Sequence, residues 1–395
     1  LALSGDNTFS GGVRLNGGNL QIDNPLSLGL ALPGGSGVQT ALGTSLRFAA
    51  PGTYAIDSVI SGGGAVSKTG TGTLTLTGNN SYSGGTSILG GTLLIGGSSA
   101  LGSGGVSMTG QSTLATATGV SASINGLTLD ASANVSLAAA SGQTLTLGGA
   151  LTTSTSGNSI QFGSASQTGT VGFDFASVQP VAASTSVAVN GGTLRLNALG
   201  GGFLLSAGGG LTLASGGTID LNGFAGGGVN LTGAGAITNA ALAGAQFEAS
   251  QNAASTFSGV IGGGTGAISL VKSGTGALTL TGANSYTGTT SITGGSLQIG
   301  DGGTTGNLGT GNVSIAGGAQ LLFNRGDALS LANVFGGAGT VQKNLANTLT
   351  LTGSNTNENG FTGTFNVNAG TLVVNGVLGD PVSYTHLTLP TIYSV

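Results

Sequence analysis

Residues 68–96 have the sequence KTGTGTLTLTGNNSYSGGTSILGGTLLIG, from which the fold can be inferred. Its central run, LTLTG at 74–78, alternates apolar and hydroxylated residues, and this period of two predicts a half-buried β-strand. Glycine and asparagine then supply a turn, because both tolerate a positive φ. Two further short strands are expected around 87–89 and 93–95, on either side of a Gly-Gly turn. The stretch therefore predicts three short strands joined by tight turns.

The same pattern recurs along the chain. Residues 272–300 align with 68–96 without a gap, and residues 1–23 fit the same register. Residues 343–375 form a fourth copy, with four residues inserted in the asparagine-rich turn. All lysines of the chain fall at one repeat position and four aromatic residues at another: Lys68, Lys272 and Lys343, then Phe9, Tyr82, Tyr286 and Phe361. Looser copies lie between, and self-similarity of this kind predicts a solenoid.

The length of the strands explains why the repeats must stack. A strand of three to five residues cannot bury an apolar face alone, whereas successive coils bury leucine on leucine and isoleucine on isoleucine in one column. Neighbouring parallel strands lie about 4.8 Å apart. No segment combines a helical period with helix caps. The predicted fold is all-β, an elongated parallel β-helix (solenoid) over residues 1–380.

The composition excludes most kinds of chemistry. The 395 residues include 82 glycines, one histidine and no cysteine, so disulfides, thiol catalysis and cysteine-bound zinc are excluded. Seven lysines and arginines, scattered singly, cannot form the basic stripe that nucleic-acid binding requires. The mean hydropathy of +0.36 argues against disorder. We expect no catalytic residues, no metal site and no cofactor.

The repeats resemble the autotransporter-associated β-strand repeat, also called the passenger-associated transport repeat. The resemblance rests on K-[TS]-G-T-G-x-L-T-L-T-G-x-N-S-Y-[ST]-G-x-T-S-I-x-G-G-[TS]-L-x-I-G, shared by residues 68–96 and 272–300. It implies a right-handed β-helix passenger of a type V secretion system, displayed on the cell surface of a Gram-negative bacterium. It also implies that the partner is the protein's own C-terminal outer-membrane β-barrel. In the family, the repeat is a stalk element that helps secretion and folding.

The expected function is a non-enzymatic stalk or adhesin-type passenger segment, with a host-surface or matrix ligand as a further partner. Two alternatives stay open: a piece of a β-helix enzyme that acts on polysaccharides, and an exoprotein of a two-partner secretion system. A shared fold carries no activity by itself. The eleven acids are also spaced too widely for a calcium-binding cluster. Because the chain lacks an initial methionine and a signal peptide, we expect it to be a piece of a longer protein.

One motif suggests an adhesion site. Arg325, Gly326 and Asp327 spell the integrin-recognition tripeptide. The motif lies in the segment Phe-Asn-Arg-Gly-Asp just before the repeat at 343–375, and F-N-R-x-D is a common element there in the family. A structural pairing of Arg325 with Asp327 is therefore favoured over receptor binding.

The two columns of recurring residues also have alternative interpretations. The lysines are predicted to be solvated at the edge of a coil, where lysine discourages edge pairing, and a weak anion-binding ladder is the alternative. The aromatic residues are predicted to fill the corner of the coil after the asparagine turn, and stacking on sugars is the alternative.

The last fifteen residues differ from the rest. Residues 381–395, PVSYTHLTLPTIYSV, lack glycine yet contain the single histidine, His386. Residues 382–391 resemble the translation of an adapter used in sequencing libraries. We therefore expect this tail to be non-native, with no part in the fold and no role for His386.

Overall fold

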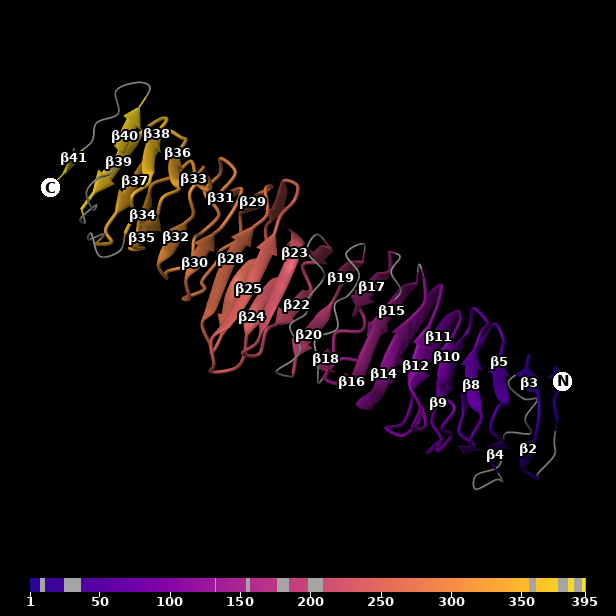
Figure 1. Cartoon of the computed structure of the whole chain (residues 1–395). Helices are drawn as coiled ribbons and strands as arrows, with labels where there is room; N and C mark the ends of the chain where they lie inside the picture. The colour runs from indigo at the N-terminus through magenta and orange to yellow at the C-terminus, as the bar shows by residue number, and fades with distance from the viewer. Residues whose placement is uncertain are drawn as a thin grey trace. The chain divides into compact units, whose positions relative to one another are not determined.

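The computed structural model describes residues 1–7, 11–24, 37–131, 133–153, 157–175, 185–197, 209–354, 360–375, 383–386 and 393–394. These residues form strands, turns and bends without any helix, which confirms the all-β prediction (Figure 1). No helix that could cross a membrane occurs in this part of the chain. The chain divides into two compact units, Leu1–Gly201 and Gly202–Val395.

The first unit consists of parallel sheets wound from successive coils. Its first sheet contains, in spatial order, β1 (Ala2–Leu3), β3 (Asn19–Ile22), β5 (Ser45–Phe48), β8 (Ala65–Lys68), β10 (Thr86–Ile88), β12 (Val106–Met108), β14 (Ala122–Leu129), β16 (Thr144–Thr153), β18 (Thr170–Phe175) and β20 (Gly192–Leu196). Its second contains β6 (Thr53–Ile56), β9 (Thr73–Leu76), β11 (Gly91–Ile95), β13 (Gln111–Thr116), β15 (Asn134–Ala138), β17 (Ser159–Phe162) and β19 (Ser186–Val189). A short third sheet contains β2 (Val13–Leu15), β4 (Val38–Thr40) and β7 (Ile60–Gly62).

The core of this unit is a set of apolar columns produced by in-register stacking. One column runs through the second sheet and consists of Leu74, Leu93, Leu114, Leu137, Phe162 and Val189. Each of these side chains is buried. The residues between them along each strand, such as Thr73 and Thr75, face outward and are only partly buried. The predicted alternation and leucine-on-leucine stacking, and with them the parallel solenoid, are confirmed.

The strong repeat is longer than one coil, which the sequence did not reveal. Strands β9 and β11 both belong to residues 68–96, yet they pair directly with each other, with Leu74 beside Leu93 and Leu76 beside Ile95. Strands β8 and β10 pair in the same way. One copy of the motif therefore supplies strands to two neighbouring coils, so its residues can bond across that coil boundary.

The second unit is built by the same rule from four parallel sheets. The longest contains β21 (Gly210–Leu213), β23 (Ala225–Gly233), β26 (Ser255–Phe257), β29 (Ala277–Leu280), β31 (Ser296–Ile299), β33 (Gln320–Phe323), β36 (Thr340–Lys343), β38 (Thr364–Val367) and β40 (Ser383–His386). A second begins at β23 and continues through β25 (Ala245–Ser250), β28 (Ile268–Ser273), β30 (Thr290–Ile292), β32 (Val313–Ile315) and β35 (Phe335–Gly337). The others contain β22 (Gly217–Asp220), β24 (Ala236–Asn239) and β27 (Val260–Gly264), and β34 (Leu329–Leu331), β37 (Thr348–Leu351), β39 (Thr371–Val374) and β41 (Tyr393–Ser394).

The second unit repeats the apolar column of the first. Here the column consists of Leu278, Leu297, Leu321, Val341 and Phe365, all of them buried. Phe365 also lies edge-on to Phe335 and Phe361, with ring centroids 5.9 and 5.2 Å away. Such edge-to-face contacts add stability beyond the area that they bury. The core of this unit is thus continuous from coil to coil.

Shortening one column residue tests the importance of stacking. We expect Leu93→Ala to destabilise the first unit by about 2–5 kcal/mol, because the fully buried side chain leaves a cavity between two coils. Ser123→Ala, at an exposed position of β14, is the matched control and changes stability by no more than about 0.5 kcal/mol. Urea denaturation followed by circular dichroism measures both, and equal effects would contradict the column.

Candidate functional site

All three lysines of the chain are buried, with exposed fractions of 0% for Lys68, 0% for Lys272 and 3% for Lys343. The prediction that they are solvated at a coil edge is wrong. In its strand, each lysine shares the inward face with the residue two positions earlier, since strand side chains alternate between faces. Those residues are Val66, Leu270 and Val341, and all three are buried.

Each lysine ammonium donates hydrogen bonds to oxygens of two successive turns. The first turn follows the lysine's own strand, and the second belongs to the next coil. Lys68 Nζ bonds Gly70 O and, at 3.2 Å, Gly90 O. Lys272 Nζ bonds Ser273 O at 2.7 Å, Gly274 O at 3.2 Å and Gly294 O at 3.1 Å. Lys343 Nζ bonds Leu345 O, Asn347 Oδ1 at 2.6 Å and Ala369 O at 3.1 Å.

The oxygens around each lysine ammonium form a cage that contains no carboxylate. Burial lowers the pKa of all three lysines from the ordinary 10.5, to about 8 for Lys272 and Lys343. The ion pair between Arg325 and Asp327 is the one salt bridge among the described residues, and it involves no lysine. Main-chain carbonyls, and for Lys343 also the amide oxygen of Asn347, therefore accept the hydrogen bonds of each ammonium, which are made inside the fold rather than to an external anion.

The turn that carries the cage requires glycine. Gly91 has a φ of 69°, in the left-handed region that favours glycine. A Cβ atom there would also lie only 2.8 Å from Lys68 Nζ. The Gly-Gly turn of the motif thus leaves room for the lysine.

In the repeats at 68–96 and 272–300, a buried asparagine bridges the coils on both sides of it. The side chain of Asn80 accepts a hydrogen bond from Ile60 N at 2.8 Å and donates one to Ala100 O at 2.6 Å. In the second unit, Asn284 accepts from Ile261 N and donates to Asn307 O, both at 2.8 Å. One amide therefore satisfies two main-chain groups that would otherwise be buried without partners.

The recurring aromatic residues fill the corners of the coils, as predicted. Tyr82 and Tyr286 are 0% and 2% exposed, and their hydroxyls bond the Oγ1 atoms of Thr86 and Thr290 at 2.7 and 2.8 Å. Phe361 is buried at the equivalent position. The prediction is confirmed for these three residues, whereas Phe9 lies outside the described part of the chain.

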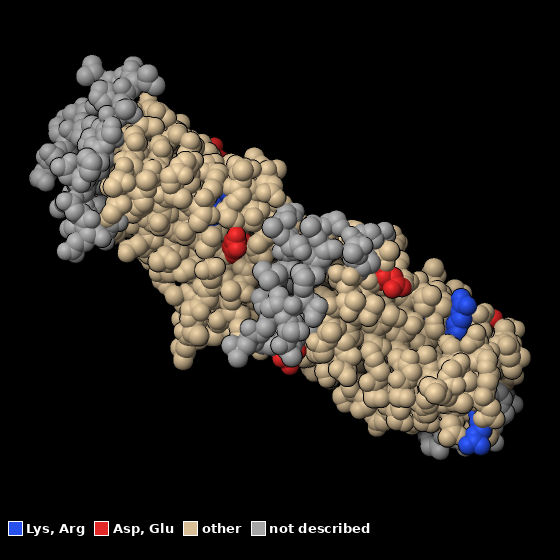
Figure 2. Space-filling view, viewed as in Figure 1, with Lys and Arg blue, Asp and Glu red and all other residues tan. Residues whose placement is uncertain are grey.

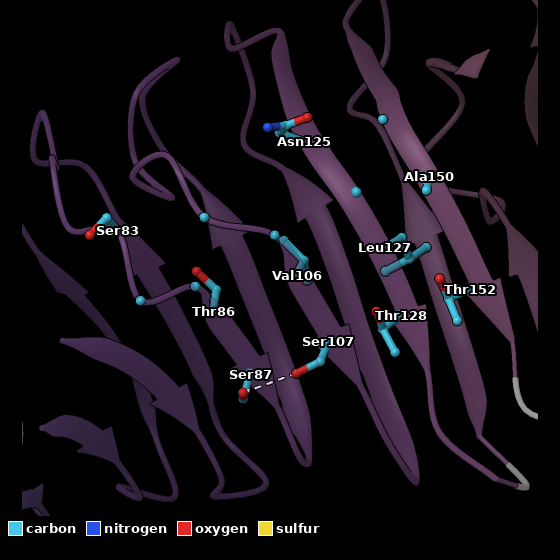
Figure 3. A pocket seen from close by; sticks show the side chains of 16 residues that line it. Ser83, Thr86, Ser87, Val106, Ser107, Asn125, Leu127, Thr128, Ala150 and Thr152 are labelled. Atoms are coloured by element: carbon cyan, nitrogen blue, oxygen red, sulfur yellow. Dashed lines mark hydrogen bonds between the residues drawn. The ribbon is translucent and has the colours of Figure 1, made fainter. Parts of the chain in front are cut away.

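A polar groove of about 480 Å³ crosses β10, β12, β14 and β16 on the outer side of the first unit's first sheet (Figure 3). An in-register row of hydroxyls runs along it: Ser87, Ser107, Thr128 and Thr152. Ser107 Oγ donates to Ser87 Oγ at 2.9 Å. A groove of about 390 Å³ recurs in the second unit, where Ser291 and Ser314 occupy the same positions.

The chemistry of these grooves is limited. None of the residues that line either groove is charged. General acid–base catalysis requires a titratable side chain within reach of the substrate, and nucleophilic catalysis requires a base beside the hydroxyl. No group of three or more His, Cys, Asp or Glu side chains that could hold a metal ion occurs among the described residues. The grooves can offer hydrogen bonds to a ligand.

The residues of the predicted adhesion tripeptide lie together, but Arg325 is only 8% exposed. All five guanidinium N–H groups are used: Nε to Asp327 Oδ1 at 2.8 Å, Nη1 to Gly306 O and Asn307 Oδ1 at 2.8 Å each, and Nη2 to Thr304 O at 2.7 Å and Asp327 Oδ2 at 2.6 Å. The bond from Arg325 lowers the pKa of Asp327. This geometry favours the structural pairing, and receptor binding by Arg325, Gly326 and Asp327 stays a prediction.

The predicted foreign tail lies largely outside the described residues. Its described strands, β40 and β41, pair in parallel with β38 and β39. A non-native origin for residues 381–395 stays a prediction. The structure describes no side-chain contacts of His386.

Comparison with known sequences identifies the repeat. The family model described as the passenger-associated-transport-repeat matches residues 1–22, 66–95, 270–299 and 346–374. These four segments are therefore similar to the repeat of autotransporter passengers. Over 85 residues it is 46% identical to the adhesin BmaC autotransporter of Brucella suis biovar 1 (strain 1330), a match that covers 21% of this chain and 2% of the relative. No solved structure matches the chain.

Removing one ammonium tests the cage of the passenger repeat. We expect Lys272→Met to destabilise the second unit by about 1–3 kcal/mol, because three carbonyl oxygens lose their donor. Arg14→Met, at an exposed position, is the control for loss of a positive charge and changes stability by no more than about 0.5 kcal/mol. Chemical denaturation measures both variants, and a Lys272→Met protein as stable as the parent would contradict the cage.

The lowered lysine pKa predicts a pH dependence of stability. Lys272 titrates near 10.5 when unfolded and near 8 when folded, so between these values the unfolded chain holds more protons. The free energy of unfolding therefore rises with pH in this window. Above pH 10 the effect is opposed, since burial raises the pKa of Tyr82 from 10.0 to about 12.

Denaturation midpoints measured at about pH 7.5 and 9.5 test this prediction, because in that range the lysines titrate and the tyrosines remain mostly protonated. The parent chain becomes more stable at the higher pH, and Lys272→Met shows a smaller increase. The same increase in both proteins would show that Lys272 does not contribute.

Proposed function

We propose that this chain is a stalk segment of a surface autotransporter passenger, that it supports secretion and surface display, and that it has no enzymatic activity. One observation carries the proposal: the strong repeats at 68–96, 272–300 and 343–375 tie neighbouring coils together through buried polar side chains. Lys272 bonds turns of two coils, and Asn284 bonds the coils before and after its own. Such residues stabilise a scaffold, whereas a catalytic centre needs reactive groups that face a cleft.

The solenoid architecture explains how these bonds would help secretion. The stability of a solenoid is roughly the sum of the contributions of its coils and of the contacts between neighbours, so folding can start in one place and spread. A repeat that bonds adjacent coils strengthens those contacts locally. We infer that the strong repeats are where a passenger emerging unfolded on the outer side of the membrane first becomes stably folded.

The partner and location follow from the passenger assignment. We infer that the passenger is joined to its own C-terminal outer-membrane β-barrel and is displayed on the surface of a Gram-negative bacterium. Adhesion to a host-surface or matrix ligand is the second part of the proposal. It is supported by the 46% identical segment shared with a protein named an adhesin.

Variants in one strong repeat test the stalk function. Lys272→Met combined with Asn284→Ala, in the full passenger with its barrel, is expected to lower surface display several-fold at 37 °C, because the coils around the repeat lose their bridging bonds. Ser330→Ala, at an exposed position of β34, is the matched control. Surface antibody labelling, normalised to total protein, measures display. Undiminished display of the double variant would contradict the proposed role.

A further inference from the structure

The two best-matched repeats differ in one loop. The loop between β11 and β12 spans residues 96–105, whereas the equivalent loop between β31 and β32 spans 300–312 and is three residues longer. Asn80 and Asn284 hold equivalent positions in the two repeats, and they bond Ala100 O and Asn307 O respectively. Ala100 of the shorter loop therefore corresponds to Asn307 of the longer one. The additional residues therefore lie within 301–306.

Arg325, paired with Asp327, holds the longer loop in place, and we call this pair the clamp. The first repeat has no such pair. The strand register shows which residues correspond: Ile299 pairs with Phe323 in the second unit, and the equivalent Ile95 pairs with Thr116 in the first. Counting two and four residues onward from Phe323 and Thr116, Arg325 corresponds to Thr118 and Asp327 to Val120. Arg325 directs three of its five N–H groups at the loop: to Thr304 O, Gly306 O and Asn307 Oδ1. The main chain adds bonds of 2.7 Å from Gly302 N to Asn324 O and from Gly326 N to Gly303 O.

The clamped loop is held in place but remains exposed. Residues 301–305, with the sequence Asp-Gly-Gly-Thr-Thr, are all exposed, whereas Gly306 below them is buried. The loop thus offers one carboxylate and two hydroxyls on a backbone that is already ordered. A partner that binds a pre-ordered loop does not have to overcome the entropy of fixing it.

The charges of the second unit indicate the kind of partner. Every lysine and arginine in its described part is buried, namely Lys272, Arg325 and Lys343. The carboxylates that reach solvent there are those of Glu248, Asp301 and Asp327, and Asp301 is the most exposed of the three. Asp327 is already paired with Arg325, so Asp301 is the carboxylate that the loop presents to a partner. Charged side chains are also sparse on the face shown in Figure 2. A surface with carboxylates and no exposed cation in this part favours a cationic partner and disfavours phosphate-bearing ones.

We propose that the loop 301–305 binds a basic protein segment rich in lysine and arginine, with Arg325 as the residue that positions the loop. The inference rests on the proposed adhesive function and names the kind of ligand. It assigns the tripeptide an internal role, in which Arg325 and Asp327 present the loop rather than contact the receptor.

Binding of a synthetic lysine- and arginine-rich peptide of about ten residues to the folded chain tests the proposal. Asp301→Asn is expected to weaken binding about two- to fivefold, as for an exposed ion pair. Deleting residues 303–305, which gives the loop the length of its counterpart in the first unit, weakens binding about tenfold or more. Glu248→Gln is the matched control with the same change of charge and leaves binding unchanged.

Attachment of bacteria that display the full passenger separates this inference from the adhesive function. If the parent passenger does not attach to host surfaces, the adhesive function fails. If it attaches and the 303–305 deletion attaches equally well, the loop inference is overturned. Loss of attachment in Asp327→Glu but not in the deletion would assign adhesion to the tripeptide instead. Equal weakening by Asp301→Asn and Glu248→Gln would show only general charge attraction, which also overturns the inference.

Discussion

In-register stacking of short parallel strands is the interaction on which both units depend. A strand such as Thr73–Leu76 has two inward leucines, and these become buried only when Leu93 and Ile95 of the next coil lie on them. Every coil therefore needs its neighbours, and stability accumulates along the stack rather than around one centre. This requirement also explains the composition, because alternating aliphatic and hydroxylated residues with glycine turns are sufficient to continue the stack.

Stacking creates a second requirement at the corners, where the chain turns and main-chain groups are buried without ladder partners. An unpaired buried carbonyl or N–H group is costly. The repeats at 68–96 and 272–300 meet this requirement with a lysine and an asparagine, which bond main-chain groups of the turns, while the tyrosine hydroxyl bonds a threonine side chain. The same principle operates at Arg325, which satisfies the carbonyls of an enlarged loop. Nearly all positive charge in the second unit is used in this way.

Much of the fold could be predicted from residues 68–96, since a period of two and a recurring motif are local properties of the sequence. The burial of the lysines was missed although a signal was present: Val66 and Lys68 are two residues apart in one strand and must share a face. The signal was overridden because lysine is rarely found fully buried in proteins. The clamp could not have been predicted, because Arg325 contacts a loop about twenty residues earlier in the chain, and only the register brings the two together. The pairing of Arg325 with Asp327 is local, and it was foreseen.

The interior position of the lysines has a consequence for reactivity. No side-chain amine of the chain lies at the surface, since Lys68, Lys272 and Lys343 are all buried. Acylating reagents and lysine-directed proteases can therefore reach these residues only when the surrounding coils open. Modification of each lysine thus reports the opening of one particular repeat, so the protein carries three built-in probes of local unfolding at known positions.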